Sequence, residues 1–253
     1  MRIHHLNCGS LCPRGGSLLG GAGGPLSPAP MCCHCLLIEG DDRLILVDTG
    51  LGVEDVNEPR RLGFLFNTLA RPRLKVAETA LRQVADLGYR PSDVRHIVPT
   101  HLDLDHAGGL IDFPGASVHV YAPELKAALN PPTLVERNRY RAVQLAGVAK
   151  WAPVEADGED WCGFSSVRAL PGARDDFLLI PLPGHTRGHC GVAVWGGFSI
   201  AATPISTMPR LRPQAAGARR ASGGSSPASM STRQSEWRTR NGCSSSRAIT
   251  AAR

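Results

Sequence analysis

Apolar runs alternate with segments of helical periodicity along the first 194 residues. The runs over 44–47, 118–121 and 177–182 predict buried strands, because they are short and rich in β-branched and aliphatic residues. A helix closed by Gly88 is predicted by apolar residues three and four positions apart, namely Ala77, Ala80, Leu81, Val84 and Leu87. Another helix is expected over 123–129. Strands that alternate with helices predict a layered α/β fold.

Composition sets limits on this fold. With 253 residues, 42% of them hydrophobic, the chain can form one sizeable domain. No apolar stretch is long enough to cross a membrane, and the start Met1-Arg2-Ile3-His4-His5 lacks the apolar core of a signal peptide. We therefore expect no membrane association and a cytoplasmic location.

The net positive charge of the chain comes entirely from its C-terminal part. Residues 207–253 contain nine Arg, no Lys and one acid, Glu236. The rest of the chain, with 19 of the 28 bases and 21 of the 22 acids, is close to −2, whereas the tail is close to +8. Ser, Ala, Gly, Pro and Arg dominate the tail without apolar periodicity, so we expect no core there.

The densest candidate chemistry is the run His101-Leu102-Asp103-Leu104-Asp105-His106-Ala107-Gly108-Gly109. Imidazoles and carboxylates are seldom buried unless they are paired or bind a metal. If the run leaves the end of a strand, His101, Asp103 and Asp105 share one face, and His106 begins a turn that the two glycines allow to fold tightly. The alternative is a solvated polar loop, but such a loop needs neither the leucines nor the period of two.

The run resembles the metal motif of the metallo-β-lactamase superfamily, and three further stretches resemble motifs of the same family. Leu46-Val47-Asp48-Thr49-Gly50 is similar to its early strand and turn, whose Asp braces the metal loop. His96-Ile97-Val98-Pro99-Thr100 is similar to the strand that delivers the motif, and Pro183-Gly184-His185-Thr186-Arg187-Gly188-His189 to the second metal loop. The resemblance covers residues 1–194 and implies an αββα four-layer sandwich.

The resemblance also implies a ligand set. His101, Asp103 and His185 are expected to hold a first divalent metal, and Asp105 and His106 to face a second one. A hydroxide between such ions attacks a carbonyl or phosphoryl centre, and Asp105 is the expected catalytic residue that orients it. His189 is expected to be a supporting residue, with metal ligation as the alternative.

Asp103 departs from the commonest family pattern, which has His at this position. Zinc is the expected metal, with one or two ions bound. A carboxylate is a harder ligand than an imidazole, so iron or manganese is the alternative.

Three other features leave alternatives open. The cluster Met31-Cys32-Cys33-His34-Cys35 fits no zinc-site spacing, so we expect reduced thiols, with a gating or redox role as the alternative. Residues 51–75 and 130–161 read as insertions that form pocket walls. Within them, Arg137, Arg139, Tyr140 and Arg141 are expected to form one solvated face, and steering of an anionic substrate is the alternative.

The tail is explained best by a slip of the reading frame near Val194 or Trp195. Codons for residues 195–208, shifted by two bases with permissible third bases, can encode an apolar run ending in Gly-Asp-Ala. This tripeptide resembles the next family motif, whose Asp bridges the two metals. The hypothesis makes 1–194 a domain with an incomplete second half, and 195–253 an out-of-frame, disordered tail.

Two functions follow from these observations. The first is a metal-dependent hydrolase of an ester, lactone, thioester or similar bond in a small-molecule substrate, of the lactonase-like branch and impaired because second-metal ligands are missing. The second is a non-catalytic remnant or binding protein whose basic tail contacts nucleic acid. We expect only non-specific nucleic-acid contacts, because the tail lacks the aromatic residues that stack on bases.

Overall fold

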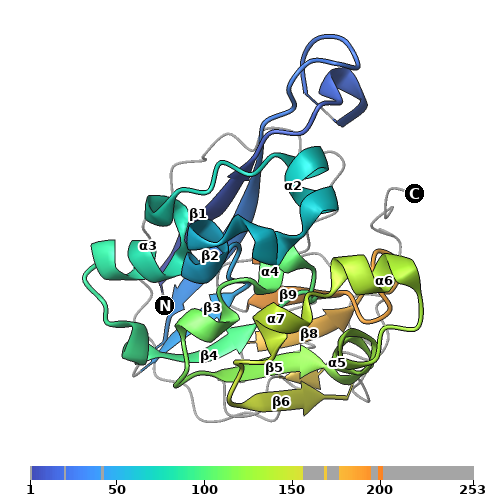
Figure 1. Ribbon diagram of the computed structural model, residues 1–253. Helices are drawn as coiled ribbons and strands as arrows, with labels where there is room; N and C mark the ends of the chain where they lie inside the picture. The colour runs from blue at the N-terminus through green and yellow to red at the C-terminus, as the bar shows by residue number, and fades with distance from the viewer. Residues whose placement is uncertain are drawn as a thin grey trace, which may run out of the picture.

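Two β-sheets form the centre of the molecule (Figure 1). The computed structural model describes residues 2–19, 21–40, 43–155, 168–169, 177–194 and 199–201. The larger sheet has the strand order β1-β2-β3-β4-β5-β6, with the bounds Arg2–Leu11, Met31–Glu39, Leu44–Val47, Val94–Val98, Ser117–Tyr121 and Trp151–Val154. Strands β1, β2 and β3 pair antiparallel, and β3, β4, β5 and β6 pair parallel.

The smaller sheet is antiparallel throughout. Its strand order is β10-β9-β8-β7, with the bounds Ser199–Ala201, Cys190–Val194, Phe177–Pro181 and Arg168–Ala169. The described α-helices all precede this sheet in the chain. They are α1 to α7, with the bounds Val53–Asn57, Phe64–Ala70, Ala80–Asp86, Leu104–Ala107, Ala122–Leu129, Leu134–Arg139 and Ala142–Leu145.

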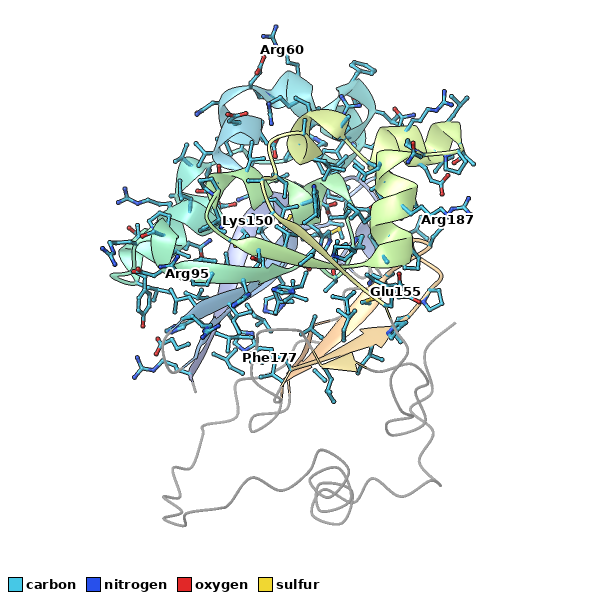
Figure 2. All side chains as sticks on the ribbon, turned by 90° about the horizontal axis from the view of Figure 1, so that it is seen from below. Arg60, Arg95, Lys150, Glu155, Phe177 and Arg187 are labelled. Atoms are coloured by element: carbon cyan, nitrogen blue, oxygen red, sulfur yellow. The ribbon has the colours of Figure 1, made fainter. Side chains whose placement is uncertain are left out.

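The apolar residues form two main layers of core, one on each face of the larger sheet. One core cluster joins Leu37, Leu46 and Ile97 of the sheet to helical residues such as Val84 and Ala127. The other joins the opposite face of the sheet to β8 and β9. Figure 2 shows the same order from below, with helices above the larger sheet and Phe177 on the smaller sheet beneath it.

These layers confirm the α/β class and the helix, sheet, sheet part of the αββα sandwich. Successive side chains of a strand point to opposite faces, so β2 contributes Leu37 to the first core and Leu36 and Ile38 to the second. This explains why the buried strands lack a polar alternation. Among the described residues no second helical layer covers the smaller sheet, and the tail from 202 onward lies outside them.

The predicted elements lie where the pattern placed them, with shifted ends. Strand β3 spans the predicted 44–47, and α5 begins one residue before the predicted 123. The helix predicted from Ala77 begins at Ala80, because Thr79 caps it by accepting a hydrogen bond from Arg82 N. Leu87 lies beyond its last turn and is 40% exposed.

The described residues include six of the eight cysteines. These six are free, of which Cys8, Cys33, Cys35 and Cys190 are buried and Cys32 is exposed. Cys162 and Cys243 lie outside the described residues. No helix in the described part of the chain has the length and apolar character needed to cross a membrane.

Candidate metal centre

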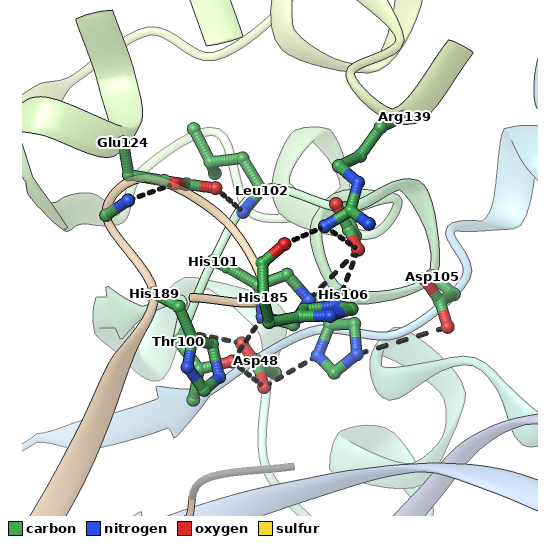
Figure 3. A network of polar contacts seen from close by, with 12 residues as sticks. Asp48, Thr100, His101, Leu102, Asp105, His106, Glu124, Arg139, His185 and His189 are labelled. Carbon is green, nitrogen blue, oxygen red and sulfur yellow. Dashed lines mark hydrogen bonds and ion pairs between the residues drawn. The ribbon is translucent and has the colours of Figure 1, made fainter. Parts of the chain in front are cut away.

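The candidate site lies where β4 ends, and its ligands come from two loops and a short helix (Figure 3). Strand β4 stops at Val98, and His101 follows in irregular backbone. Asp103 is the N-cap residue of α4, which carries Asp105 and His106. His185 lies in the loop between β8 and β9.

The expected strand periodicity over 101–105 is therefore wrong. Helix α4 begins at Leu104, so Asp105 is turned away from the face that a strand would share with His101 and Asp103. Gly108 is required for a reason other than a positive φ angle. Gly108 has helical φ and ψ angles, and a Cβ there would lie 2.2 Å from Asp55 Oδ2, so the residue is needed for close packing against α1.

Three of the predicted ligands converge. Asp103 Oδ2 lies 3.3 Å from His101 Nε2 and 3.0 Å from His185 Nε2. One ligand atom from each of these residues lies within 4.8 Å of the other two. His101 is fully buried and Asp103 is 7% exposed, so the group forms a compact set of two nitrogens and one carboxylate oxygen.

Asp48 and Thr100 set the orientation of the His101 imidazole. Thr100 donates its hydroxyl hydrogen to Asp48 Oδ2 over 2.8 Å, and the same hydroxyl lies 2.9 Å from His101 Nδ1. The hydroxyl therefore accepts a hydrogen bond from His101 Nδ1, which leaves the Nε2 lone pair free. The Asp48 side chain also accepts from Thr100 N over 2.7 Å, so the brace expected at Asp48 is present.

The unpartnered atoms fit a metal. His101 Nε2 and Asp103 Oδ1 are buried and make no hydrogen bond. Buried polar atoms usually have a partner, and here the two lie within one convergent set of nitrogen and carboxylate donors. The residues present therefore suit a divalent metal.

Asp105 and His106 form a separate pair. His106 Nδ1 lies 2.9 Å from Asp48 Oδ2, so its Nε2 is the free nitrogen, and this atom lies 4.0 Å from Asp105 Oδ2. Among the described residues no third ligand joins this pair within the same short distances. The first predicted ligand set is thus brought together, and the second is present as two residues.

The electrostatics of the site favour bound cations. Burial opposes ionisation of Asp103, but the imidazoles of His101 and His185 and the Arg139 guanidinium hold the pKa of its carboxyl well below the usual range. Burial likewise disfavours a charged His106, yet Asp48 and Asp105 raise the pKa of this imidazole to about 9. Asp103 is therefore ionised at neutral pH, and the carboxylates of Asp48 and Asp105 favour positive charge at His106.

Glu124 is a supporting residue that the sequence reasoning missed. The residue lies in α5 and is completely buried. Its Oε1 accepts a hydrogen bond from Leu102 N and its Oε2 one from Gly188 N, both over 2.9 Å. Glu124 thereby joins the loop of His101 to the loop of His185. The only signal in the sequence was an acid among apolar residues of a predicted helix.

His189 donates from Nδ1 to the carbonyl of Leu182 over 3.1 Å, and its Nε2 is buried without a hydrogen bond. Its ring centroid lies 5.1 Å from that of His101. Burial, and then the nearby His101, lower the pKa of His189 to about 4. The residue borders the site but lies outside the convergent set, as expected of a supporting residue.

A cavity of about 770 Å³ opens beside the ligands. Asp103, Asp105, His106 and His185 line it. Residues 62–70 and 134–141 form much of its wall, so the pocket role expected of the two insertions is confirmed for these parts. The N-terminal hairpin, from Leu11 to His34, contributes a third side that the sequence reasoning did not anticipate.

The expectation of one solvated arginine face is wrong. Arg139 and Arg141 line the cavity, and Tyr140 between them is 3% exposed. Arg137 alone is exposed. Helix α6 ends at Arg139, and the chain then turns inward, which a charge count along the sequence cannot reveal.

This architecture agrees with a family comparison. Residues 30–197 match the model of the metallo-beta-lactamase superfamily. The chain belongs to this superfamily. The matched range contains all five predicted metal-site residues and both loops joined by Glu124.

Individual superfamily members are similar to different extents. Probable metallo-hydrolases of Mycobacterium tuberculosis and Mycobacterium bovis are each 48% identical over 197 residues, which cover 78% of this chain and 59% of theirs. An N-acyl homoserine lactonase of Bacillus thuringiensis is 28% identical over 167 residues, or 66% of this chain and 58% of the lactonase. The chain thus spans less than two thirds of the length of these relatives.

Solved structures share the fold. A variant of the AiiA protein of Bacillus thuringiensis with N-decanoyl-L-homoserine at its active site has a TM-score of 0.59 and 24% identity, covering 76% of this chain and 69% of that one. A probable metal-dependent hydrolase from Staphylococcus aureus has a TM-score of 0.57 and 18% identity, covering 78% and 69%. These similarities establish the sandwich architecture of the superfamily for this chain.

Proposed function

We propose that the chain is a metal-dependent hydrolase of an ester, lactone, thioester or similar bond in a small-molecule substrate. The observation that carries the proposal is the convergence of His101, Asp103 and His185 beside a large, mostly apolar cavity that Asp103 and His185 line. Large apolar pockets with a few convergent polar groups are typical of small-molecule sites. The metallo-hydrolase and lactonase names of the relatives support the reaction class.

His101, Asp103 and His185 would hold a first divalent metal, and Asp105 and His106 would face a second one. When bound, the metal supplies Lewis acidity and lowers the pKa of a coordinated water to about 7. Thr100 and Asp48 keep His101 and His106, respectively, in the tautomers that offer Nε2 lone pairs.

Asp105 is the proposed catalytic residue. Its carboxylate lines the cavity, its side chain is 13% exposed, and Oδ2 faces His106 Nε2. A carboxylate in this position can orient an attacking water and hold its proton.

The test combines metal analysis with hydrolysis. The full chain is purified and loaded with zinc, iron(II) or manganese(II), its metal content is measured by mass spectrometry, and it is assayed with aryl esters and acyl homoserine lactones. We expect Asp105→Asn to lower kcat/KM by about 100-fold or more. Asp86→Asn, an exposed carboxylate paired with Arg82, is the matched control and should leave the rate unchanged.

Two outcomes would contradict this proposal. Only trace metal after loading would remove the metal site, and equal rates for Asp105→Asn and the wild type would remove the assigned role of Asp105. Salt-sensitive DNA binding that disappears when residues 207–253 are deleted would instead support the binding-protein function.

We also propose that the reading frame slips near Val194 or Trp195. The change in composition after Val194 and the end of the family match at residue 197 support this hypothesis. In that case the chain lacks the bridging Asp and last His that the resemblance implies, and its activity is impaired. Sequencing the gene across the codons for 185–210 tests the hypothesis, because an unchanged frame would refute it.

A further inference from the structure

Two carboxylates and two guanidinium groups line the cavity among the described residues, and the two guanidinium groups differ in whether a carboxylate pairs with them. Asp103 and Asp105 belong to the proposed metal site. Arg139 Nη1 lies 3.4 Å from Asp103 Oδ2 and donates to the carbonyl of His185 over 2.6 Å, so this guanidinium is occupied by the site. Arg141 is different, because no carboxylate of the described residues lies within ion-pair distance of it.

The Arg141 side chain is nevertheless held in place. Its Nε donates to the carbonyl of Arg61 over 2.9 Å. Gly63, at the start of α2, lets the guanidinium pack closely, because a Cβ there would lie 3.3 Å from Arg141 Cζ and Nη1. One edge of the guanidinium is thus fixed on backbone, and the remaining N–H groups are available in a preset orientation.

The cavity that Arg141 lines is mostly apolar. Leu65, Phe66, Leu69, Leu134 and Val135 line the same cavity and carry no polar side-chain groups. A cation on an apolar wall gains most from a ligand that brings the opposite charge together with an apolar body. Arg141 follows Arg139 by two residues, so their Cα atoms are at most about 7 Å apart, and such a ligand can also reach the metal ligands.

We propose that the substrate is an anionic acyl compound, with its hydrocarbon part in the apolar cavity and a carboxylate on the Arg141 guanidinium. This inference rests on the proposed hydrolase function and narrows its substrate class. The carboxylate can belong to the acyl chain or to the leaving group, because both lie in the same cavity during the reaction.

The experiment compares esters that differ in one charge. The para-nitrophenyl ester of hexanoic acid is neutral, and the para-nitrophenyl monoester of adipic acid carries a carboxylate on the acyl chain. To place the carboxylate on the leaving group, the anionic hexanoyl ester of para-hydroxybenzoate is compared with the neutral hexanoyl ester of para-hydroxyacetophenone. We expect one anionic ester to exceed its neutral equivalent in kcat/KM by about tenfold, the effect of one charge-assisted contact at a partly exposed site.

Variants assign this preference to Arg141. Arg141→Gln should abolish the preference while the neutral ester is still hydrolysed, and Arg141→Lys should restore part of it. Arg137→Gln is the matched control, because Arg137 is an exposed arginine of α6 that does not line the cavity. A merely structural role of Arg141 predicts equal losses for neutral and anionic esters.

Binding measurements keep this inference separate from the hydrolase proposal. By calorimetry, the monoamide of adipic acid, which carries one carboxylate, should bind the wild type about tenfold more tightly than the neutral diamide, and Arg141→Gln should remove the difference. Absence of all ester hydrolysis would refute the hydrolase function, and binding of the adipic acid monoamide and diamide would then decide the role of Arg141 alone. Equal values for charged and neutral ligands, or a preference kept in Arg141→Gln, would overturn the inference.

Discussion

Glu124 provides the sharpest test of how the fold holds the candidate site. Its carboxylate accepts one backbone N–H from each metal loop, at Leu102 and Gly188, from a fully buried position. In Glu124→Gln a single side-chain oxygen remains, and the new amide group faces the second N–H. One charge-assisted hydrogen bond is lost and one buried donor is left without an acceptor, which costs about 3 kcal/mol.

This cost is large compared with the 5–15 kcal/mol that stabilises a typical domain. With an m-value of roughly 2 kcal/mol per molar urea, the unfolding midpoint should fall by about 1–2 M without a change in m. Unfolding is followed by circular dichroism in metal-free protein, so that lost metal binding does not contribute. Zinc affinity, measured separately, should also fall, because the loops of His101 and His185 are no longer joined.

Glu58→Gln is the control, because Glu58 is a half-exposed acid that pairs with Arg60 on the surface. It should leave both the midpoint and the zinc affinity unchanged. If Glu124→Gln unfolds at the same urea concentration as the control, the carboxylate does not bridge the two loops, and the reasoning from burial and hydrogen bonding is refuted.

Three further predictions concern metal affinity, metal choice and pH. Thr100→Val removes the hydroxyl that orients His101 and should weaken metal binding about 10- to 100-fold in a competition titration with a chelator; an unchanged affinity would contradict the tautomer argument. Asp103→His should raise the ratio of zinc to manganese retained from an equimolar mixture, measured by mass spectrometry, and a lower ratio would contradict the ligand assignment. Burial, and then His96, lower the pKa of His119 to about 4, so the unfolded chain takes up a proton near pH 6.5 that the folded protein refuses. The free energy of unfolding of metal-free protein should therefore fall by about 2–3 kcal/mol more between pH 6.5 and 4 than in His119→Gln, with equal slopes above pH 7; parallel curves throughout would refute this assignment.

Local sequence patterns predicted which residues form the site better than they predicted how those residues are arranged. The spacing of His101, Asp103 and His106 identified the first loop, but the strand expected to continue through Asp105 is a helix from Leu104. A period of two over five residues also fits an irregular segment followed by a helical turn, because both can bury alternate leucines. The choice depends on Gly108 packing against Asp55 from another part of the chain.

Supporting residues were harder to predict because their partners are distant in sequence. Glu124 reaches a backbone N–H 64 residues away, and neither its residue type nor its helix distinguishes it from a surface acid. Arg139 and Arg141 were expected on a solvated face with Arg137. Their inward direction depends on where α6 ends and on the loop of His185, which accepts a hydrogen bond from Arg139.

The sequence by itself determined the α/β class and the buried strands, because hydrophobic period is a local property, and the resemblance of its motifs to a family indicated the candidate metal ligands. The tertiary structure alone decided which ligands converge, how Asp48 and Glu124 hold them, and which arginines face the cavity. These features depend on contacts between segments far apart in the chain, such as Asp103 with His185, which are 82 residues apart, and no local pattern encodes such contacts.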